Sequence, residues 1–149
     1  MSLNSNSQLH DEKTFYQTFL HDLNHCQNEV IIESPFITSV RMKTFDRVFK
    51  NLLKRDVKIF IITREPNEHD NGYEFQSEEA IRWCETQGIQ VLLCTGNHHR
   101  KLAILDRKVL WEGSLNILSQ TKSREIMRRI EEEEIALQMF NFLKLAKFL

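Results

Sequence analysis

Residues 57–63 read Val-Lys-Ile-Phe-Ile-Ile-Thr, a near-continuous run of β-branched and aromatic side chains. Such a run is typical of a strand that is buried on both faces of a parallel sheet. Shorter apolar runs at 30–32 and 89–94 have the same character and indicate two more buried strands. These stretches together predict a parallel sheet as one part of the fold.

Segments with helical spacing alternate with these strands. Apolar residues recur at intervals of three and four over residues 11–27 and 42–53. A third helix is predicted from about residue 74 to residue 87, where Gly88 ends it. The repeated order of helix and strand is typical of α/β proteins.

The rhythm changes in the last third of the chain. Two short strands are predicted at 102–105 and 109–111, with a tight turn at 106–108 between them. A further strand is predicted over 124–130, and a final helix begins at 131–134, whose acidic side chains suit a helix N-terminus. The predicted fold class is therefore α/β, with one mixed β-sheet sandwiched between helices.

Length and composition favour one globular domain. The chain has 149 residues, of which 41% are hydrophobic and 28% are charged. We expect a single domain over residues 10–149 after a disordered leader over residues 1–9. No apolar stretch reaches the roughly 20 residues of a membrane span, and the start lacks the cationic and apolar segments of a signal peptide. We therefore expect no membrane partner.

The cysteines favour a reducing compartment. Cys26, Cys84 and Cys94 are odd in number and lack the short paired spacing of a disulfide framework or a zinc site. We expect buried, unreactive thiols and a cytoplasmic location.

The overall charge of −1 conceals a basic stretch. Residues 98–130 contain eight cations and three anions, whereas the remaining residues are net acidic. A basic stretch within an acidic protein is a candidate anion-binding surface. Alternating charges on solvated strand faces are the structural alternative.

The segment 99–116 contains side chains that suit a phosphate group. Positions two apart on a strand share a face, so His99 and Lys101 are expected to face one pocket. Gly113 and Ser114 offer close backbone approach and a small hydroxyl, and Asn116 offers an amide. An imidazole, an ammonium, a hydroxyl and an amide can together attack a phosphate and stabilise its charge.

These residues fit the pattern His-x-Lys-x4-Asp-x6-Gly-Ser-x-Asn, and here the chain resembles the phospholipase D superfamily. The pattern is met by His99, Lys101, Asp106, Gly113, Ser114 and Asn116. The resemblance covers about residues 10–140 and implies the sandwich fold of that family. It further implies that Glu125 orients the catalytic histidine. Asp106 falls in the predicted hairpin turn, which favours a structural role.

The resemblance also implies a mechanism. His99 would attack phosphorus to form a covalent phosphohistidine, while Lys101, Asn116 and Ser114 hold the phosphate oxygens. No step requires a metal or another cofactor. A second histidine must protonate the leaving oxygen, but only one motif is present, and His98 is expected to point away from His99. A homodimer with two copies of His99 at one site is therefore expected.

Nucleic acid is the favoured substrate, as DNA or RNA, and the predicted activity is that of an endonuclease. The residues expected to follow its backbone are Arg100, Lys122, Arg124, Arg128 and Arg129. Aromatic residues for base stacking are sparse near the motif, because Trp111 is expected in the core.

Two alternatives remain open. Residues 34–37 and 111–128 are similar to phospholipase D-like domains attached to bacterial helicases and ATPases, which makes a non-catalytic nucleic-acid-binding module, with a helicase or ATPase as partner, the second hypothesis. A phospholipase is the third, since the last helix carries Phe140, Phe142 and Phe148.

Overall fold

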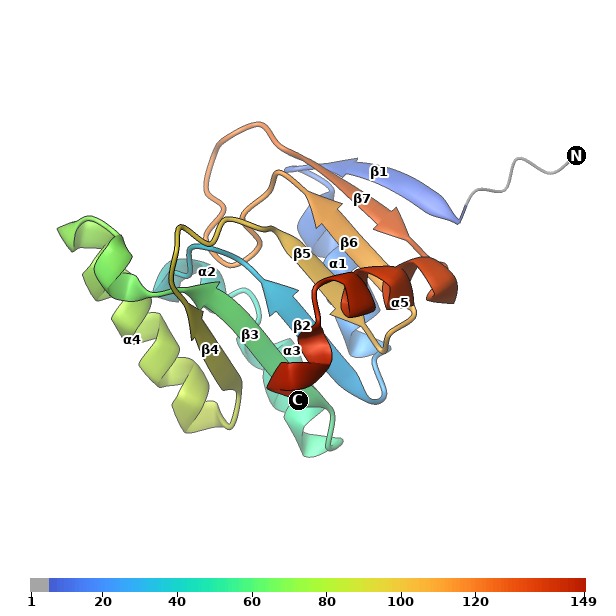
Figure 1. The fold of residues 1–149 in the computed structure, drawn as a ribbon, viewed down its shortest axis with the longest axis horizontal. Coiled ribbons are helices and arrows are strands. Elements are labelled where there is room, and N and C mark those ends of the chain that lie inside the picture. Colours follow the sequence, from blue (N-terminus) through green and yellow to red (C-terminus); the bar gives the residue numbers. More distant parts are fainter. Residues whose placement is uncertain (1–5) are drawn as a thin grey trace, which may run out of the picture.

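A computed structural model describes residues 6–149, which contain one seven-stranded sheet (Figure 1). The strand order is β1-β7-β6-β5-β2-β3-β4. The parallel part consists of β2 (Glu29–Glu33), β3 (Lys58–Arg64) and β4 (Gln90–Cys94). The parallel strands predicted from the apolar runs are confirmed.

The other strands are antiparallel to their neighbours. They are β5 (Leu102–Leu105), β6 (Val109–Gly113), β7 (Ile126–Ile130) and β1 (Ser7–Asp11). The disordered leader predicted over 1–9 is wrong for residues 7–9, which pair with β7, and residues 1–5 lie outside the described residues. Strand β1 escaped prediction because it lies at the edge of the sheet, where a strand needs no apolar run.

Helices cover both faces of this mixed sheet, which confirms the predicted fold class. Figure 1 shows α5 crossing one face, with α1 and α3 behind the strands. The helices are α1 (Phe15–Asn24), α2 (Ser39–Met42), α3 (Asp46–Lys54), α4 (Asn71–Gln87) and α5 (Glu133–Phe142), with short 3-10 turns η1 (Pro66–Glu68) and η2 (Leu145–Phe148). In the described part of the chain, no helix is long and apolar enough to cross a membrane.

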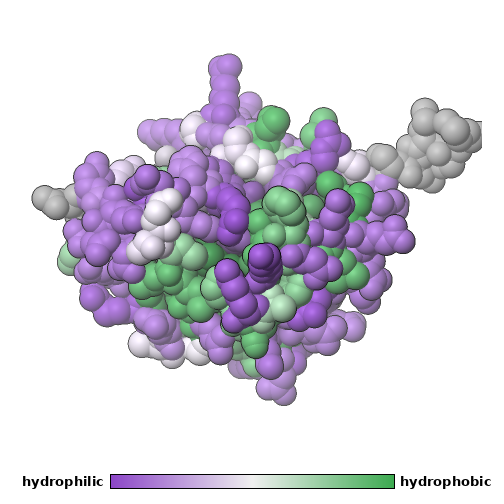
Figure 2. Space-filling model, viewed as in Figure 1, coloured by the Kyte–Doolittle hydropathy of each residue, from purple (hydrophilic) through white to green (hydrophobic). Residues whose placement is uncertain are grey.

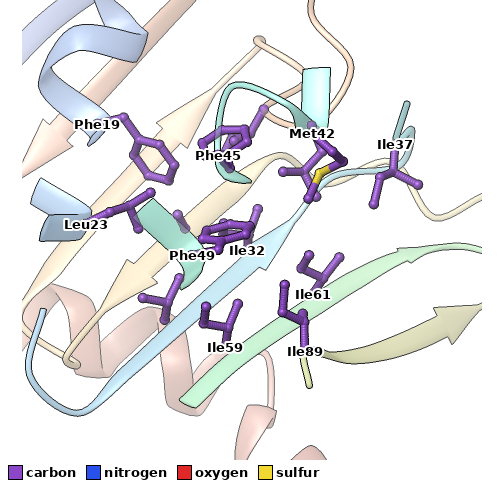
Figure 3. Close-up of a cluster of buried hydrophobic side chains, with 14 of the residues drawn as sticks. Phe19, Leu23, Ile32, Ile37, Met42, Phe45, Phe49, Ile59, Ile61 and Ile89 are labelled. Carbon is purple, nitrogen blue, oxygen red and sulfur yellow. The ribbon is translucent and has the colours of Figure 1, made fainter. Parts of the chain in front are cut away.

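The larger core lies between the sheet and helices α1, α3 and α4. Figure 3 shows the aromatic residues of this layer above the strand residues Ile32, Ile59 and Ile61. Phe45 and Phe49 stack with their ring centroids 5.2 Å apart. Trp111 is also completely buried here, and its indole nitrogen donates to Asp22 at 2.8 Å. Trp111 therefore belongs to the core and is not available to stack on a base.

A smaller core lies under α5 and η2. Phe60 and Ile104 of the sheet pack there with Phe140 and Leu145. Figure 2 shows apolar side chains grouped in the middle of this face, with polar side chains around them. Phe142 of the same helix is different, because 79% of its surface is exposed.

The segments that carry the predicted site residues meet at one end of the sheet. Because β2 and β5 are antiparallel, Leu102 at the start of β5 lies opposite Glu33 at the end of β2. Leu102 also pairs with Glu112 of β6, which pairs with Arg128 of β7. The residues just before β5 and just after β6 therefore meet at the carboxyl end of the parallel strands.

Asp106 closes the opposite end of the β5–β6 hairpin. Asp106 and Arg107 both have positive φ angles, of 53° and 55°, as a tight two-residue hairpin turn requires. The Asp106 carboxylate accepts hydrogen bonds from the backbone N–H groups of Gln27, Asn28 and Glu29, at 2.8–3.0 Å. Asp106 thus ties the hairpin to the start of β2.

Asp106→Asn is expected to lower the free energy of unfolding by about 1–3 kcal/mol, because charge-assisted acceptors are lost while asparagine still tolerates a positive φ. The measurement is urea denaturation. Lys108→Ala, an exposed change in the same turn, is the matched control and should have little effect. Equal stabilities of the Asp106→Asn variant and the parent would contradict the structural role.

Candidate active site

His99 and Lys101 lie in the segment before β5. The sequence predicted that they share a strand face, but β5 begins only at Leu102. They still line one groove of about 900 Å3 together with Ser114, Asn116 and Glu125. The structure therefore brings the five predicted catalytic residues to one place, although they come from three segments of the chain.

The segment between β4 and β5 is fixed by Glu68. The Glu68 carboxylate accepts the backbone N–H groups of Gly96 at 2.9 Å and Asn97 at 3.3 Å, and these bonds lower its pKa. Arg64 binds both Glu68, at 3.1 Å, and the side-chain oxygen of Asn97, at 2.8 Å. The approach to His99 is thereby held in one conformation.

Lys101 determines the state of His99. Its Nζ lies 2.9 Å from the His99 Nδ1 atom and 2.9 Å from the His99 carbonyl oxygen. The ammonium charge, followed by partial burial, lowers the pKa of His99 below its usual value. An ammonium can only donate, so Nδ1 is the acceptor and the imidazole is neutral. A neutral imidazole is the form that can attack phosphorus.

Glu125 lies directly before β7 and lines the same groove as His99 and Lys101. Hydrogen bonds from Ser123 and Ser114 lower the pKa of the Glu125 carboxyl, and the charge of Lys101 lowers it further. Burial lowers the pKa of Lys101, whereas Glu125 opposes that shift. The ring nitrogen Nδ1 of His99 faces Lys101. That Glu125 orients His99 stays a prediction.

Gly113 and Ser114 lock the end of β6 to the start of β7. Ser114 exchanges backbone and side-chain hydrogen bonds with Ile126, including its own N–H to the Ile126 carbonyl at 2.9 Å and the Ile126 N–H to Ser114 Oγ at 3.0 Å. A Cβ atom at Gly113 would collide with that carbonyl and lie 2.8 Å from the Met127 sulfur. Only glycine fits this close approach.

Asn116 presents an unsatisfied polar group. Its backbone carbonyl accepts the N–H groups of Ser119 and Gln120, which fixes the turn after β6. Its side-chain Oδ1 is buried without a hydrogen-bond partner among residues 6–149. Such a group is costly unless a ligand or water satisfies it. The Oδ1 atom is therefore available to accept a hydrogen bond from a donor group of a ligand or from water.

Glu33, for which no role was predicted, lies beneath the site. This carboxylate at the end of β2 is completely buried, with Oε1 2.9 Å from His98 Nε2 and 3.0 Å from Arg100 Nε. It therefore anchors the residues on both sides of His99. The available signal was an acidic residue that ends the apolar run 30–32.

The five basic residues predicted to bind nucleic acid separate into groups. Arg100 and Arg128 line the groove, and Lys122 and Arg124 are exposed in the segment before β7. The prediction that Arg129 lies with the other basic residues is corrected. Arg129 binds Asp22 at 2.7 and 3.0 Å and Glu131 at 2.9 Å, away from the groove. Neighbouring strand residues point to opposite faces, so Arg128 and Arg129 cannot serve one surface.

Comparison with known families identifies the fold. Residues 19–144 match the family described as "Cardiolipin synthase, PLD-like domain". The chain belongs to the phospholipase D superfamily. Membership of this superfamily supports an activity of the phosphodiesterase type. Comparison with curated proteins finds no matching sequence.

Solved structures have the same phospholipase D fold. Nuc from Salmonella typhimurium, a phospholipase D family member, has a TM-score of 0.75 at 16% identity over 93% of this chain and 91% of its own. NucT from Helicobacter pylori has a TM-score of 0.70 at 19% identity, over 93% and 92%. Phosphatidylserine synthase from Haemophilus influenzae Rd KW20 has a TM-score of 0.74 at 14% identity, over 99% of this chain and 40% of its own.

No group of three or more His, Cys, Asp or Glu side chains is arranged to hold a metal ion within residues 6–149. The polar groups that do converge at the phospholipase D-like site are an imidazole, an ammonium, a hydroxyl and an amide.

Lys101→Met is expected to raise the pKa of His99 towards its usual value, because the positive charge that opposes its protonation is removed. The imidazole then becomes protonated at a higher pH. NMR titration of the His99 ring protons measures the shift. Lys122→Met removes an exposed cation and serves as the control. An unchanged His99 titration in the Lys101→Met protein would refute the assigned electrostatic contact.

Proposed function

We propose that this protein is a nuclease that cleaves phosphodiester bonds of DNA or RNA through a covalent phosphohistidine on His99. The observation that carries the proposal is a neutral imidazole held 2.9 Å from an ammonium, in a groove that Ser114 and Asn116 also line. These groups supply a nucleophile and donors for the phosphate oxygens.

The reaction has two balanced steps. In the first, a nitrogen lone pair of His99 forms a P–N bond while the bond from phosphorus to the leaving oxygen breaks, and a general acid protonates that oxygen. In the second, water attacks phosphorus, the P–N bond breaks, and the same group removes the proton from water. The products are a hydroxyl end and a phosphate monoester end, and His99 is regenerated.

Lys101 has two successive partners in this scheme. In the structure it donates to Nδ1 of His99, which leaves the imidazole proton on Nε2. A substrate phosphate is a stronger acceptor than a neutral imidazole, so Lys101 turns to the phosphate oxygens. Nδ1 is then released, and the imidazole is free to present a lone pair to phosphorus.

Nucleic acid is supported as the substrate by charge near the groove. Arg128 is exposed and lines it, and Lys122 and Arg124 extend the positive surface along the segment before β7. Such cations bind a phosphate backbone by releasing its counterions. The fold shared with Nuc and NucT over nearly their full lengths adds support. A helicase or ATPase remains a proposed further partner.

A second copy of the chain is proposed to supply the general acid. His98 is held against the buried Glu33, and His69 is buried beside Phe36, so neither is free to enter the groove. Leu9, Ile126 and Phe142 line the groove and are 67%, 65% and 79% exposed. An exposed apolar wall beside the nucleophile suits a two-fold interface that brings two His99 side chains together.

His99→Ala is expected to reduce cleavage of labelled DNA or RNA in EDTA by about 10³-fold or more, because the nucleophile is lost. Gel analysis of the products measures it, with His21→Ala, an exposed histidine on α1, as the control. Binding without any product in the wild type would favour the non-catalytic module, and cleavage only of phospholipid vesicles would favour the phospholipase. Cleavage by His99→Ala at the wild-type rate would overturn the assignment.

Phe142→Glu is expected to convert a dimer to a monomer and to abolish cleavage, because a carboxylate cannot be buried in the apolar interface without a partner. Sedimentation velocity measures the size and the assay above measures activity. Val40→Glu introduces the same charge at an apolar residue that is 77% exposed and does not line the groove, and should change neither. A fully active wild-type monomer would refute the shared site.

A further inference from the structure

The groove that contains His99 and Lys101 is called the catalytic groove below. A second groove of about 370 Å3 begins beside it, at Asn116. Its aromatic walls are Phe36, from the segment after β2, and Tyr73, from the first turns of α4. The two ring centroids are 5.5 Å apart. Neither residue is near the motif in the sequence, because Tyr73 is 43 residues and Phe36 is 80 residues before Asn116.

The two rings are held by different means. Phe36 is half-buried and stacks on the buried His69 ring with a centroid separation of 4.8 Å and an interplanar angle of 26°. Tyr73 is 47% exposed and lies on α4, where Gln76 is three residues on and shares its face. Phe36 is thus a fixed wall, and Tyr73 offers an accessible ring.

The aromatic groove is joined to the catalytic groove at two points. Asn116 lines both grooves. The Phe36 and His99 rings also meet edge to face, with the centroids 6.4 Å apart and the planes at 88°. A molecule whose phosphate lies against His99 and Asn116 therefore has its neighbouring group at the aromatic groove.

The chemistry of the lining selects that group. No charged side chain lines the aromatic groove in the described structure, although charges surround the catalytic groove. A second phosphate has no cation to meet there. A flat ring with polar edges fits better, because Phe36 and Tyr73 offer aromatic faces and Gln76, Thr121 and Ser123 offer hydrogen-bonding groups.

We infer that the aromatic groove is a nucleobase subsite, which holds the base of a nucleotide next to the phosphate that is cleaved. The inference rests on the proposed nuclease function and specifies it further. Stacking on an aromatic ring tolerates any base, since every base has a π face. The subsite therefore favours unpaired nucleotides, whose bases are free to leave a stack, over a continuous duplex.

The test compares two oligonucleotides in a protein that also carries His99→Ala, so that neither is cut. One is a fluorescein-labelled oligothymidylate, and the other has the same backbone and length but abasic residues throughout. Fluorescence anisotropy measures both affinities. Tyr73→Leu is expected to weaken binding of the oligothymidylate by about 5- to 100-fold, the range for one lost stacking contact. Binding of the abasic strand should not change, because its phosphates remain.

Two further variants complete the test. Tyr73→Phe keeps the ring and should retain the affinity of the parent. Phe75→Leu removes an aromatic residue that is 62% exposed on the same helix but does not line the groove, and it should affect neither strand.

Equal affinity of the parent for both strands, or equal weakening of both by Tyr73→Leu, would overturn the subsite while leaving the nuclease proposal intact. Failure to bind either strand, together with no cleavage by the wild type, would overturn the nuclease proposal itself.

Discussion

The antiparallel pairing of β5 with β2 is the constraint on which the active site depends. The parallel strands β2, β3 and β4 all end at one edge of the sheet, and β5 starts at that edge because it runs against β2. The antiparallel pairing of β5 with β6 then places His99 and Lys101, which precede β5, next to Ser114, which directly follows β6. If β5 ran parallel to β2, the same hairpin would carry both halves of the motif to the other end of the sheet, away from Glu33.

Glu33 stabilises this edge of the sheet and orients the residues that precede β5. A carboxylate that is fully removed from water is costly unless charged partners compensate it. Its Oε1 atom is met by His98 and Arg100, but its Oε2 atom has no hydrogen-bond partner among the described residues. The flanking residues of His99 are therefore drawn inwards, and the ring of His99 remains in the groove. The buried acid thus positions His99, the proposed nucleophile, through the residues on either side of it.

Local patterns predicted much of the fold and most of the site. The run at 57–63 predicted the central parallel strand because a doubly buried strand must be apolar along its length. The motif predicted residues that line one groove because its two halves flank the open end of a single hairpin, the one formed by β5 and β6. The edge strand β1 was missed because exposed pairing leaves no apolar signature. Arg129 was misplaced because a charge count cannot tell which strand face a residue occupies.

Some residues near the site could not be predicted from the sequence for one reason. They come from segments that are far apart in the chain and meet only in the folded structure. Phe36 and Tyr73 have no common pattern in the sequence, yet the end of β2 and the start of α4 bring their rings to 5.5 Å. The resemblance placed Glu125 near His99, and the fold adds Ser114, Ser123 and Lys101 as the groups that lower the pKa of its carboxyl.

In the proposed function, the two adjoining grooves recognise nucleic acid through forces that act over different distances. Charges act over about 10 Å at ordinary ionic strength, so the cations beside the catalytic groove act first on an approaching backbone. Stacking acts only at contact, so the neutral aromatic groove acts once a phosphate is already near Lys101. Asn116 lines both grooves and is the point at which they join. In the proposed function, charge selects a nucleic acid, and the aromatic groove then selects strands whose bases are free.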